Sequence, residues 1–233
     1  MSEVSISTPH HALKSYVAKP DGPGPWPGIV VLHDALGLTD VTRGHADWLA
    51  SQGFLAVAPD LYSWGHRMRC IRATMADIQA RKGTAFDDVQ AIRQWLGSSG
   101  DCTGKIGLIG FCMTGGFAIL AAAGYGFSAS SPNYGQVPKD IDAILEGACP
   151  IVASFGKRDI SLKGAAARLE GALGRRHIDH DVKEYPDSGH SFLDDHKGGL
   201  IRVLGALLNM RYNERDAADA RARIATFFRH HLA

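Results

Sequence analysis

The chain has 233 residues, of which 45% are hydrophobic and 21% are charged, and its formal net charge at pH 7 is +1. These values are ordinary for a globular protein, and this length can bury the core of one α/β domain over residues 1–233. The nearly balanced charge argues against a broad phosphate-binding surface, so we expect no nucleic-acid partner.

The N-terminal residues and the cysteines indicate the cellular location of the protein. The first twenty residues have no apolar core of signal-peptide length, and no segment approaches the about 18 apolar residues of a membrane span. We therefore expect a cytoplasmic protein without a membrane partner, as a monomer or homodimer. The four cysteines are widely spaced, with no CxxC pair, which favours free thiols. They are Cys70, Cys102, Cys112 and Cys149.

The first half of the chain alternates between strand and helix patterns. Weak alternation predicts strands at residues 4–8 and 11–20, and after a turn-rich stretch the apolar runs predict strands at 28–34 and 54–61. Ala46, Leu49 and Ala50 recur at helical spacing, and a helix over 42–53 should end at Gly53. A polar, lid-like helix is expected within 62–83. It is followed by a helix over 85–100 with Val89, Ile92 and Leu96 on one face.

The second half continues the alternation. We expect strands at 105–111, 149–156 and 181–186, and helices at 113–124, 164–176 and 220–232. This order predicts a mostly parallel sheet covered by helices on both faces, with ligands bound at the carboxyl ends of the strands. The segment 198–212 is too apolar for a free loop, and we expect it to pack near a pocket or a partner.

The stretch GLIGFCMTGG (residues 107–116) places Cys112 between an apolar strand and a small-residue helix. Its glycines fit neither the dinucleotide fingerprint G-x-G-x-x-G nor the phosphate loop G-x-x-x-x-G-K-[ST]. It does resemble the nucleophile elbow G-x-S-x-G, in which a strained turn exposes the nucleophile. Gly110 fits this pattern, but Thr114 stands where the second glycine is expected.

Two interpretations of Cys112 follow. As a nucleophile, its sulfur would lie at the start of a helix, where the dipole favours the thiolate and the Met113 N–H can serve as an oxyanion donor. The alternative is a buried structural cysteine, because free cysteine is among the most buried residue types. The elbow alone does not separate the two.

A thiol nucleophile needs a base, and the base needs a group that orients it. In elbow folds the chain order is nucleophile, acid, histidine. Asp159 and His190 follow later predicted strands in that order. The alternatives are a helix cap for Asp159 and a surface loop position for His190. Asp187 is the rival acid, which we expect to brace the turn. The other histidines show no metal-ligand spacing, and we predict no metal.

With this elbow and the later acid and histidine, the chain resembles the dienelactone hydrolase family of α/β-hydrolases. The segments VVLHDALGL, LASQGFLAVAPDLY, GLIGFCMTGGFAIL, FGKRD and YPDSGHSF look like family segments in family order. The resemblance implies an α/β-hydrolase fold with Cys112 as nucleophile, His190 as base and Asp159 as orienting acid. It also implies an oxyanion hole formed by the backbone N–H groups of Met113 and Ala35.

Other positions match the family in part. Asp34 stands where the family carries a glutamate that interacts with the thiol; the alternative is a cap on the following turn. Tyr134 resembles an active-site tyrosine, with aromatic packing as the competing account. Asp194 replaces an arginine that holds a substrate carboxylate in the family, and a carboxylate there would repel such a substrate. A second family arginine falls near Arg67, Arg69 and Arg72, whose alternative is solvated surface charge.

The sequence thus predicts a hydrolase that cleaves a lactone or small carboxylic ester through a Cys112 acyl-enzyme, without a cofactor. Two alternatives stay open, because a fold does not fix a function. One is a ligand-binding or sensor protein on the same scaffold, and the other is an acyltransferase.

Overall fold

The computed structural model describes residues 2–195 and 211–233. Its contacts divide the chain into two compact units, Met1–Ile109 with Leu232–Ala233 and Gly110–His231. The boundary between residues 109 and 110 falls inside strand β5 (Cys102–Phe111), where the sequence shows no linker. One domain over residues 1–233 stays a prediction. The apolar segment 198–212 lies almost entirely outside the described residues.

The first unit contains five strands in the order β1-β2-β4-β3-β5. β1 and β2 form an antiparallel hairpin, β2 and β4 are also antiparallel, and β3 and β4 are parallel. These strands confirm the elements predicted from the N-terminal patterns and apolar runs. Their bounds are Ser2–Ser7 for β1, Ala12–Ala18 for β2, Trp26–Leu32 for β3 and Leu55–Pro59 for β4.

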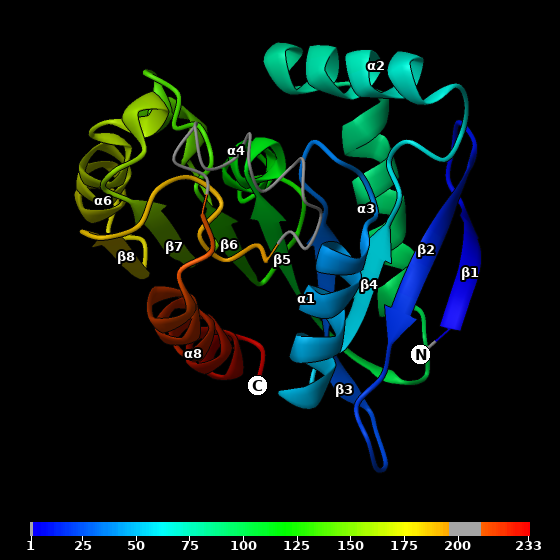
Figure 1. The fold of residues 1–233 in the computed structure, drawn as a ribbon. Helices are drawn as coiled ribbons and strands as arrows, with labels where there is room; N and C mark the ends of the chain where they lie inside the picture. The colour runs from blue at the N-terminus through cyan, green and yellow to red at the C-terminus, as the bar shows by residue number, and fades with distance from the viewer. Residues whose placement is uncertain (1, 196–210) are drawn as a thin grey trace. The chain divides into compact units, whose positions relative to one another are not determined.

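Three helices complete the first unit: α1 (Asp40–Ser51), α2 (Arg67–Ala80) and α3 (Thr84–Gly97). α1 and α3 both pack against β3 and β4, from opposite faces (Figure 1). The predicted apolar faces of both helices are buried, which confirms the helical spacing read from the sequence. α2 confirms the polar helix expected within 62–83 and packs against α3; its role as a lid stays a prediction.

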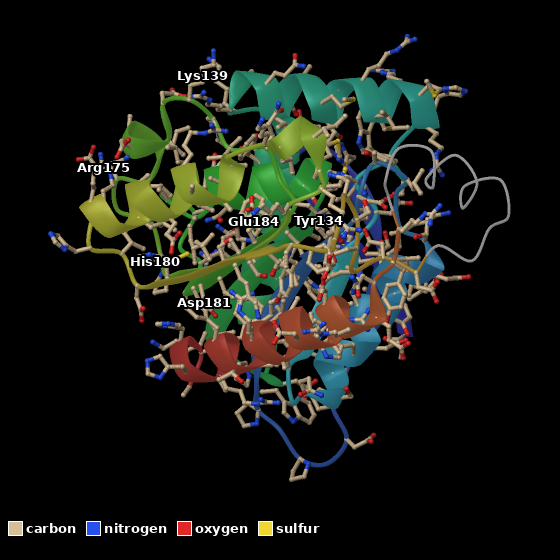
Figure 2. The ribbon with its side chains drawn as sticks, turned by 60° about the vertical axis from the view of Figure 1, so that its left-hand side comes forward. Tyr134, Lys139, Arg175, His180, Asp181 and Glu184 are labelled. Atoms are coloured by element: carbon tan, nitrogen blue, oxygen red, sulfur yellow. The ribbon has the colours of Figure 1, made fainter. Side chains whose placement is uncertain are left out.

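The second unit contains three parallel strands in the order β6-β7-β8. Helices α6 and α8 lie on opposite faces of these strands, as Figure 2 shows on either side of β8. The strand bounds are Ala129–Asn133, Ile151–Gly156 and His180–Tyr185. The helices are α4 (Met113–Leu120), α5 (Ile141–Ile144), α6 (Ala165–Arg175) and α8 (Glu214–His231).

Strand β6 and the short helix α5 are elements that the sequence patterns do not predict. The β6 sequence ASSPN is polar and contains a proline, yet all five residues are buried. The buried polar side chains of β6 form specific hydrogen bonds. Ser130 Oγ donates to Ala118 O (2.9 Å), and Asn133 Nδ2 donates to Gly110 O (3.3 Å) and to Ser131 O (3.1 Å). A polar strand is tolerated inside a fold when its groups find such partners.

Among the residues that the structure describes, none of the helices is long and apolar enough to cross a membrane. The cytoplasmic location and the monomeric or homodimeric state stay predictions.

Candidate active site

Cys112 lies on a sharp turn between the end of β5 at Phe111 and the first residue of α4, Met113. Its backbone has φ 56° and ψ −115°, a conformation that is strained for any residue with a Cβ atom. Gly110 permits the turn, because a Cβ atom there would lie 2.1 Å from Thr114 O. Cys112 is half-buried. The structure therefore has the strained strand-turn-helix geometry of a nucleophile elbow.

Thr114 occupies the second glycine position of the elbow without disturbing it. Its side chain is fully buried, its Oγ1 accepts the Phe111 N–H (3.0 Å), and its hydroxyl donates to Phe111 O (3.1 Å). The glycine needed for close approach stands one residue later. A Cβ atom on Gly115 would lie 2.4 Å from the carbonyl oxygen of Asn133 in β6. Thr114 thus closes the turn, and Gly115 provides the contact between helix and strand.

His190 links the other two predicted residues. Its Nε2 lies 3.0 Å from Cys112 Sγ, and its Nδ1 lies 2.5 Å from Asp159 Oδ2. Asp159 follows β7 and is buried, and His190 follows β8 and is partly buried. The three side chains therefore form a continuous chain of hydrogen bonds within the second unit.

Asp159 also has the capping role that was its alternative. It is the N-cap of a 3-10 helix over Ile160–Leu162, and its Oδ1 accepts from Ser161 N (3.0 Å) and Ser161 Oγ (2.6 Å). Its other oxygen remains for His190. The rival acid, Asp187, is exposed and accepts from Arg158 Nη2 at 2.7 Å. Geometry thus favours Asp159 as the partner of the histidine.

The two charges of the acid and base shift each other's pKa. Burial alone would lower the pKa of His190, but its hydrogen bonds to Asp159 and Cys112 outweigh this effect and raise the pKa to about 10. Burial would raise the pKa of Asp159, but the His190 and Ser161 hydrogen bonds outweigh it and lower the pKa below its ordinary value. This pattern describes an ionised carboxylate beside a histidine that readily holds a proton.

Tyr134 and Asp194 form a second layer beside the histidine. The Tyr134 ring meets the His190 ring edge-on, with centroids 5.4 Å apart. Its hydroxyl donates to Asp194 Oδ2 at 2.8 Å, and both side chains are buried. The ring also packs against Phe192 and Phe111, so the aromatic packing proposed as an alternative is real. Tyr134 therefore connects the buried Asp194 carboxylate to His190.

The comparison with protein families matches the dienelactone hydrolase family over residues 13–232. The chain belongs to the dienelactone hydrolase family. Its curated relatives include a putative carboxymethylenebutenolidase of Yersinia pestis, 26% identical, which covers 84% of this chain and 79% of the relative. A carboxymethylenebutenolidase of Pseudomonas putida is 28% identical and covers 86% of this chain and 89% of the relative.

Solved structures support the same fold. The chain is similar to a putative dienelactone hydrolase from Klebsiella pneumoniae, with a TM-score of 0.79, 22% identity, and coverage of 98% of this chain and 97% of that one. It is also similar to a dienelactone hydrolase-like promiscuous phosphotriesterase from metagenomic libraries, with a TM-score of 0.80, 19% identity, and coverage of 100% and 98%. The chain accordingly has the α/β-hydrolase fold predicted from its sequence.

Two residues that the dienelactone hydrolase resemblance assigns to the site, Asp34 and Ala35, lie in the first unit. Asp34 is buried, and its Oδ1 accepts the Leu36 N–H at 2.7 Å, so the turn-capping alternative is present. Ala35 is exposed. In the same unit Arg67 Nη2 donates to Leu36 O, and Arg69 stacks over the Trp64 ring at 5.6 Å. Roles for Asp34 and Ala35 in catalysis stay predictions.

Sequence reasoning missed the residues that hold the loop carrying His190. Ser188 Oγ donates to Asp216 Oδ2 at 2.6 Å, and Asn213 Nδ2 donates to the same oxygen at 3.0 Å. Asp216 lies in the first turn of α8, and both Ser188 and Asp216 are buried. The pattern N-x-x-D at a helix start was the available signal, because such residues cap helices. The cap here also anchors the loop that carries His190 to α8.

Proposed function

We propose that this dienelactone hydrolase family member cleaves a lactone or small carboxylic ester through an acyl-thioester on Cys112. Family membership makes the chain a carboxylic ester or lactone hydrolase. The observation that carries the finer proposal is the line of contacts from Cys112 Sγ to His190 Nε2 (3.0 Å) and from His190 Nδ1 to Asp159 Oδ2 (2.5 Å). Nucleophile, base and orienting acid are then in hydrogen-bond reach of one another.

In the first half of the reaction, His190 Nε2 already holds the proton taken from Cys112, because the raised pKa of His190 keeps the ring protonated through neutral pH. The sulfur then attacks the ester carbonyl carbon, and an S–C bond forms as the carbonyl oxygen becomes an oxyanion. When the intermediate collapses, the C–O bond to the leaving group breaks, and the imidazolium returns its proton to the alkoxide. The product of this half is an acyl-thioester and an alcohol, which stay joined in the case of a lactone.

In the second half, His190 takes a proton from water as the water oxygen attacks the thioester carbonyl. The S–C bond breaks, the carboxylic acid leaves, and Cys112 regains its proton or stays paired with the imidazolium. Asp159 keeps the Nδ1–H of the ring pointed at its own carboxylate, so that Nε2 faces the sulfur in both halves. The Met113 N–H, at the start of α4, is the proposed oxyanion donor from this unit.

The experiment is steady-state hydrolysis of neutral and carboxylated lactones and of nitrophenyl esters by the purified chain, beside Cys112→Ala and Cys112→Ser. We expect turnover in the wild type and a fall of at least about 10³-fold in Cys112→Ala. An acyl adduct trapped on Cys112 and detected by mass spectrometry would support the thioester.

Each competing function has its own outcome. Binding of the esters with no turnover in either protein would favour the sensor interpretation. Acyl release that accelerates with added alcohols or thiols in place of water would favour an acyltransferase. Equal turnover by the wild type and Cys112→Ala would overturn the proposed mechanism.

A further inference from the structure

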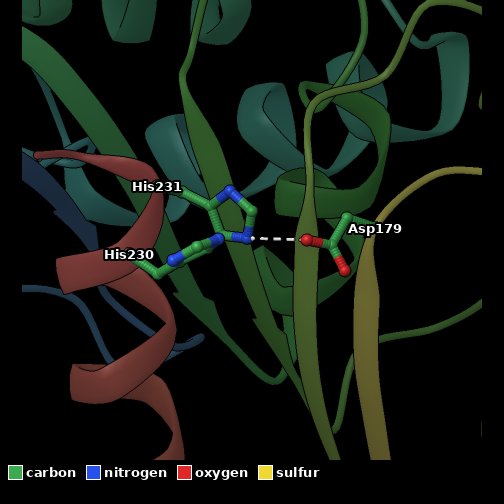
Figure 3. Close-up of side chains that lie close together, drawn as sticks. All are labelled: Asp179, His230 and His231. Atoms are coloured by element: carbon green, nitrogen blue, oxygen red, sulfur yellow. Dashed lines mark ion pairs between the residues drawn. The ribbon is translucent and has the colours of Figure 1, made fainter.

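A second cluster of chemically active side chains lies in the second unit, outside the triad. Asp179 precedes β8, and His230 and His231 end α8. One ligand atom from each of these three residues lies within 4.8 Å of the other two (Figure 3). The three line a surface cavity of about 510 Å³ together with His180, Asp181 and Arg223. We propose that Asp179, His230 and His231 bind a divalent transition-metal cation of the Zn²⁺ class.

The spacing of the donor atoms fits such a cation. His231 Nε2 lies 3.2 Å from Asp179 Oδ2. Two ligands that each lie about 2.0–2.1 Å from a tetrahedral Zn²⁺ are about 3.3 Å apart, so this pair already has the required separation. All three donor atoms lie within 4.8 Å of one another, so a movement of at most about 1.5 Å by His230, which is exposed at the end of its helix, gives the same spacing.

The surroundings hold the ligands and favour positive charge. The Phe227 ring packs against the His231 ring with centroids 4.3 Å apart, and the two imidazoles meet edge-on at 4.7 Å. The C-terminal end of a helix carries partial negative charge, so the last turn of α8 suits a cation. The nearby Arg223 is paired with Asp181 through two contacts of 2.9 and 2.6 Å, which offsets its own charge.

The donor set selects the type of cation. Two imidazole nitrogens and one carboxylate oxygen, with water completing the coordination, suit Zn²⁺, Ni²⁺ or Cu²⁺, whereas Mg²⁺ and Ca²⁺ prefer oxygen ligands alone. Bound there, the cation would join the end of α8 to the segment before β8. The site is invisible to motif searches, because Asp179 is far from the two histidines in sequence and no HExxH spacing exists.

The test uses the full chain without an affinity tag, stripped of metal with EDTA and titrated calorimetrically with ZnCl₂ and MgCl₂. We expect one Zn²⁺ to bind, with no heat from Mg²⁺, and Co²⁺ to give the intense visible bands of a four-coordinate site. Loss of a supporting residue in metal sites costs about 10–100-fold in affinity. His230→Ala and His231→Ala should therefore each weaken Zn²⁺ binding at least about 10-fold, and Asp179→Asn should also weaken it.

Two control variants separate this site from other ligands. His180→Ala removes a histidine that lines the same cavity but whose Nδ1 contacts Ile178 O at 2.7 Å, and it should leave Zn²⁺ affinity unchanged. Cys112→Ala removes the thiol of the proposed triad and should also leave Zn²⁺ affinity unchanged. Circular dichroism of the metal-free variants should match that of the wild type, which checks that the variants are folded. Equal Zn²⁺ binding by the wild type and the double variant His230→Ala/His231→Ala would overturn the proposal. No Zn²⁺ binding by the wild type would also overturn it, and the cluster would then be only an ion pair between His231 and Asp179.

Discussion

Three residues at the candidate active site hold backbone conformations that side chains rarely adopt. Cys112, Tyr134 and Ser191 have φ values of 56°, 38° and 56°. Such positions cost about 1–3 kcal/mol each, and they persist where surrounding contacts determine them. Here the contacts are those of the triad and its second layer. The backbone at these positions fixes the directions of the sulfur and the aromatic ring, which suits the pre-organisation that the proposed reaction requires.

The raised pKa of His190 leads to a pH prediction. Because Asp159 and Cys112 stabilise the imidazolium, the pKa of His190 is raised to about 10, and the protonated ring persists through neutral pH. We expect kcat/KM to fall on the alkaline side as His190 loses its proton. Asp159→Asn removes the largest stabilising contact, so the pKa should fall and the alkaline limb should move to lower pH. Initial rates measured from pH 5 to about 10.5 test this expectation.

Asp187→Asn is the matched control for that experiment. Asp187 is on the same loop as His190, but it is exposed and pairs with Arg158. Its removal should leave the alkaline limb in place. A limb that moves equally in both variants would mean that general surface charge, and not the Asp159 contact, sets the pKa of His190.

The raised pKa of His190 also makes folding stability depend on pH, again with a loss on the alkaline side. A histidine whose pKa is raised on folding contributes stability that is complete below its unfolded pKa of about 6.5 and is lost as pH rises toward about 10. Asp159 has the opposite dependence, because its pKa is lowered, and its contribution disappears as pH falls.

At the scale of elements, the contact between α4 and β6 positions Cys112, the proposed nucleophile. A Cβ atom on Gly115 would lie 2.4 Å from Asn133 O, and one on Gly135 would lie 2.2 Å from the carbonyl carbon of Gly115. Both clashes are with backbone, which cannot rotate away. We expect Gly115→Ala to push α4 from β6 and lower the free energy of unfolding by about 1–3 kcal/mol, as overpacking does. Urea denaturation measures the change.

Gly44→Ala is the matched control within a helix. Gly44 lies in α1, and a Cβ atom there meets nothing within 4 Å. Alanine has the higher helix propensity, so this variant should gain up to about 1 kcal/mol. Similar stabilities for the two variants would show that the close approach of α4 and β6 relaxes at little cost.

The sequence predicts most elements because their apolar periodicity is strong, as in α3 and β7. It fails at β6, where ASSPN carries no strand signal and the burial of its polar groups depends on partners in α4 and β5. At the site, strand ends and chain order single out Cys112, Asp159 and His190, which lie in contact in the structure, while their catalytic roles stay predictions. Ser188 and Asp216 escape prediction, because their contact joins residues 28 positions apart and only the fold brings them together.

At the scale of the molecule, one family match covers most of the chain, whereas the contacts divide the chain into two units. The dienelactone hydrolase match spans residues 13–232, which includes most of both compact units. The boundary between the units cuts β5 within its last three residues, so no flexible linker separates them. Because one strand runs across the boundary, we expect the two units to unfold together. This continuity favours a single cooperative domain.

The positions of the tryptophans and of Cys149 allow a direct test of whether the two units unfold cooperatively. All four tryptophans lie in the first unit: Trp26, Trp48, Trp64 and Trp95. Cys149 lies in the second unit, where burial raises the pKa of its thiol to about 12 and suppresses alkylation. Through a urea series, we expect tryptophan fluorescence and pulse labelling of Cys149, resolved by mass spectrometry, to change at the same midpoint. Alkylation of Cys149 at urea concentrations that leave the tryptophan signal native would show two independently unfolding units.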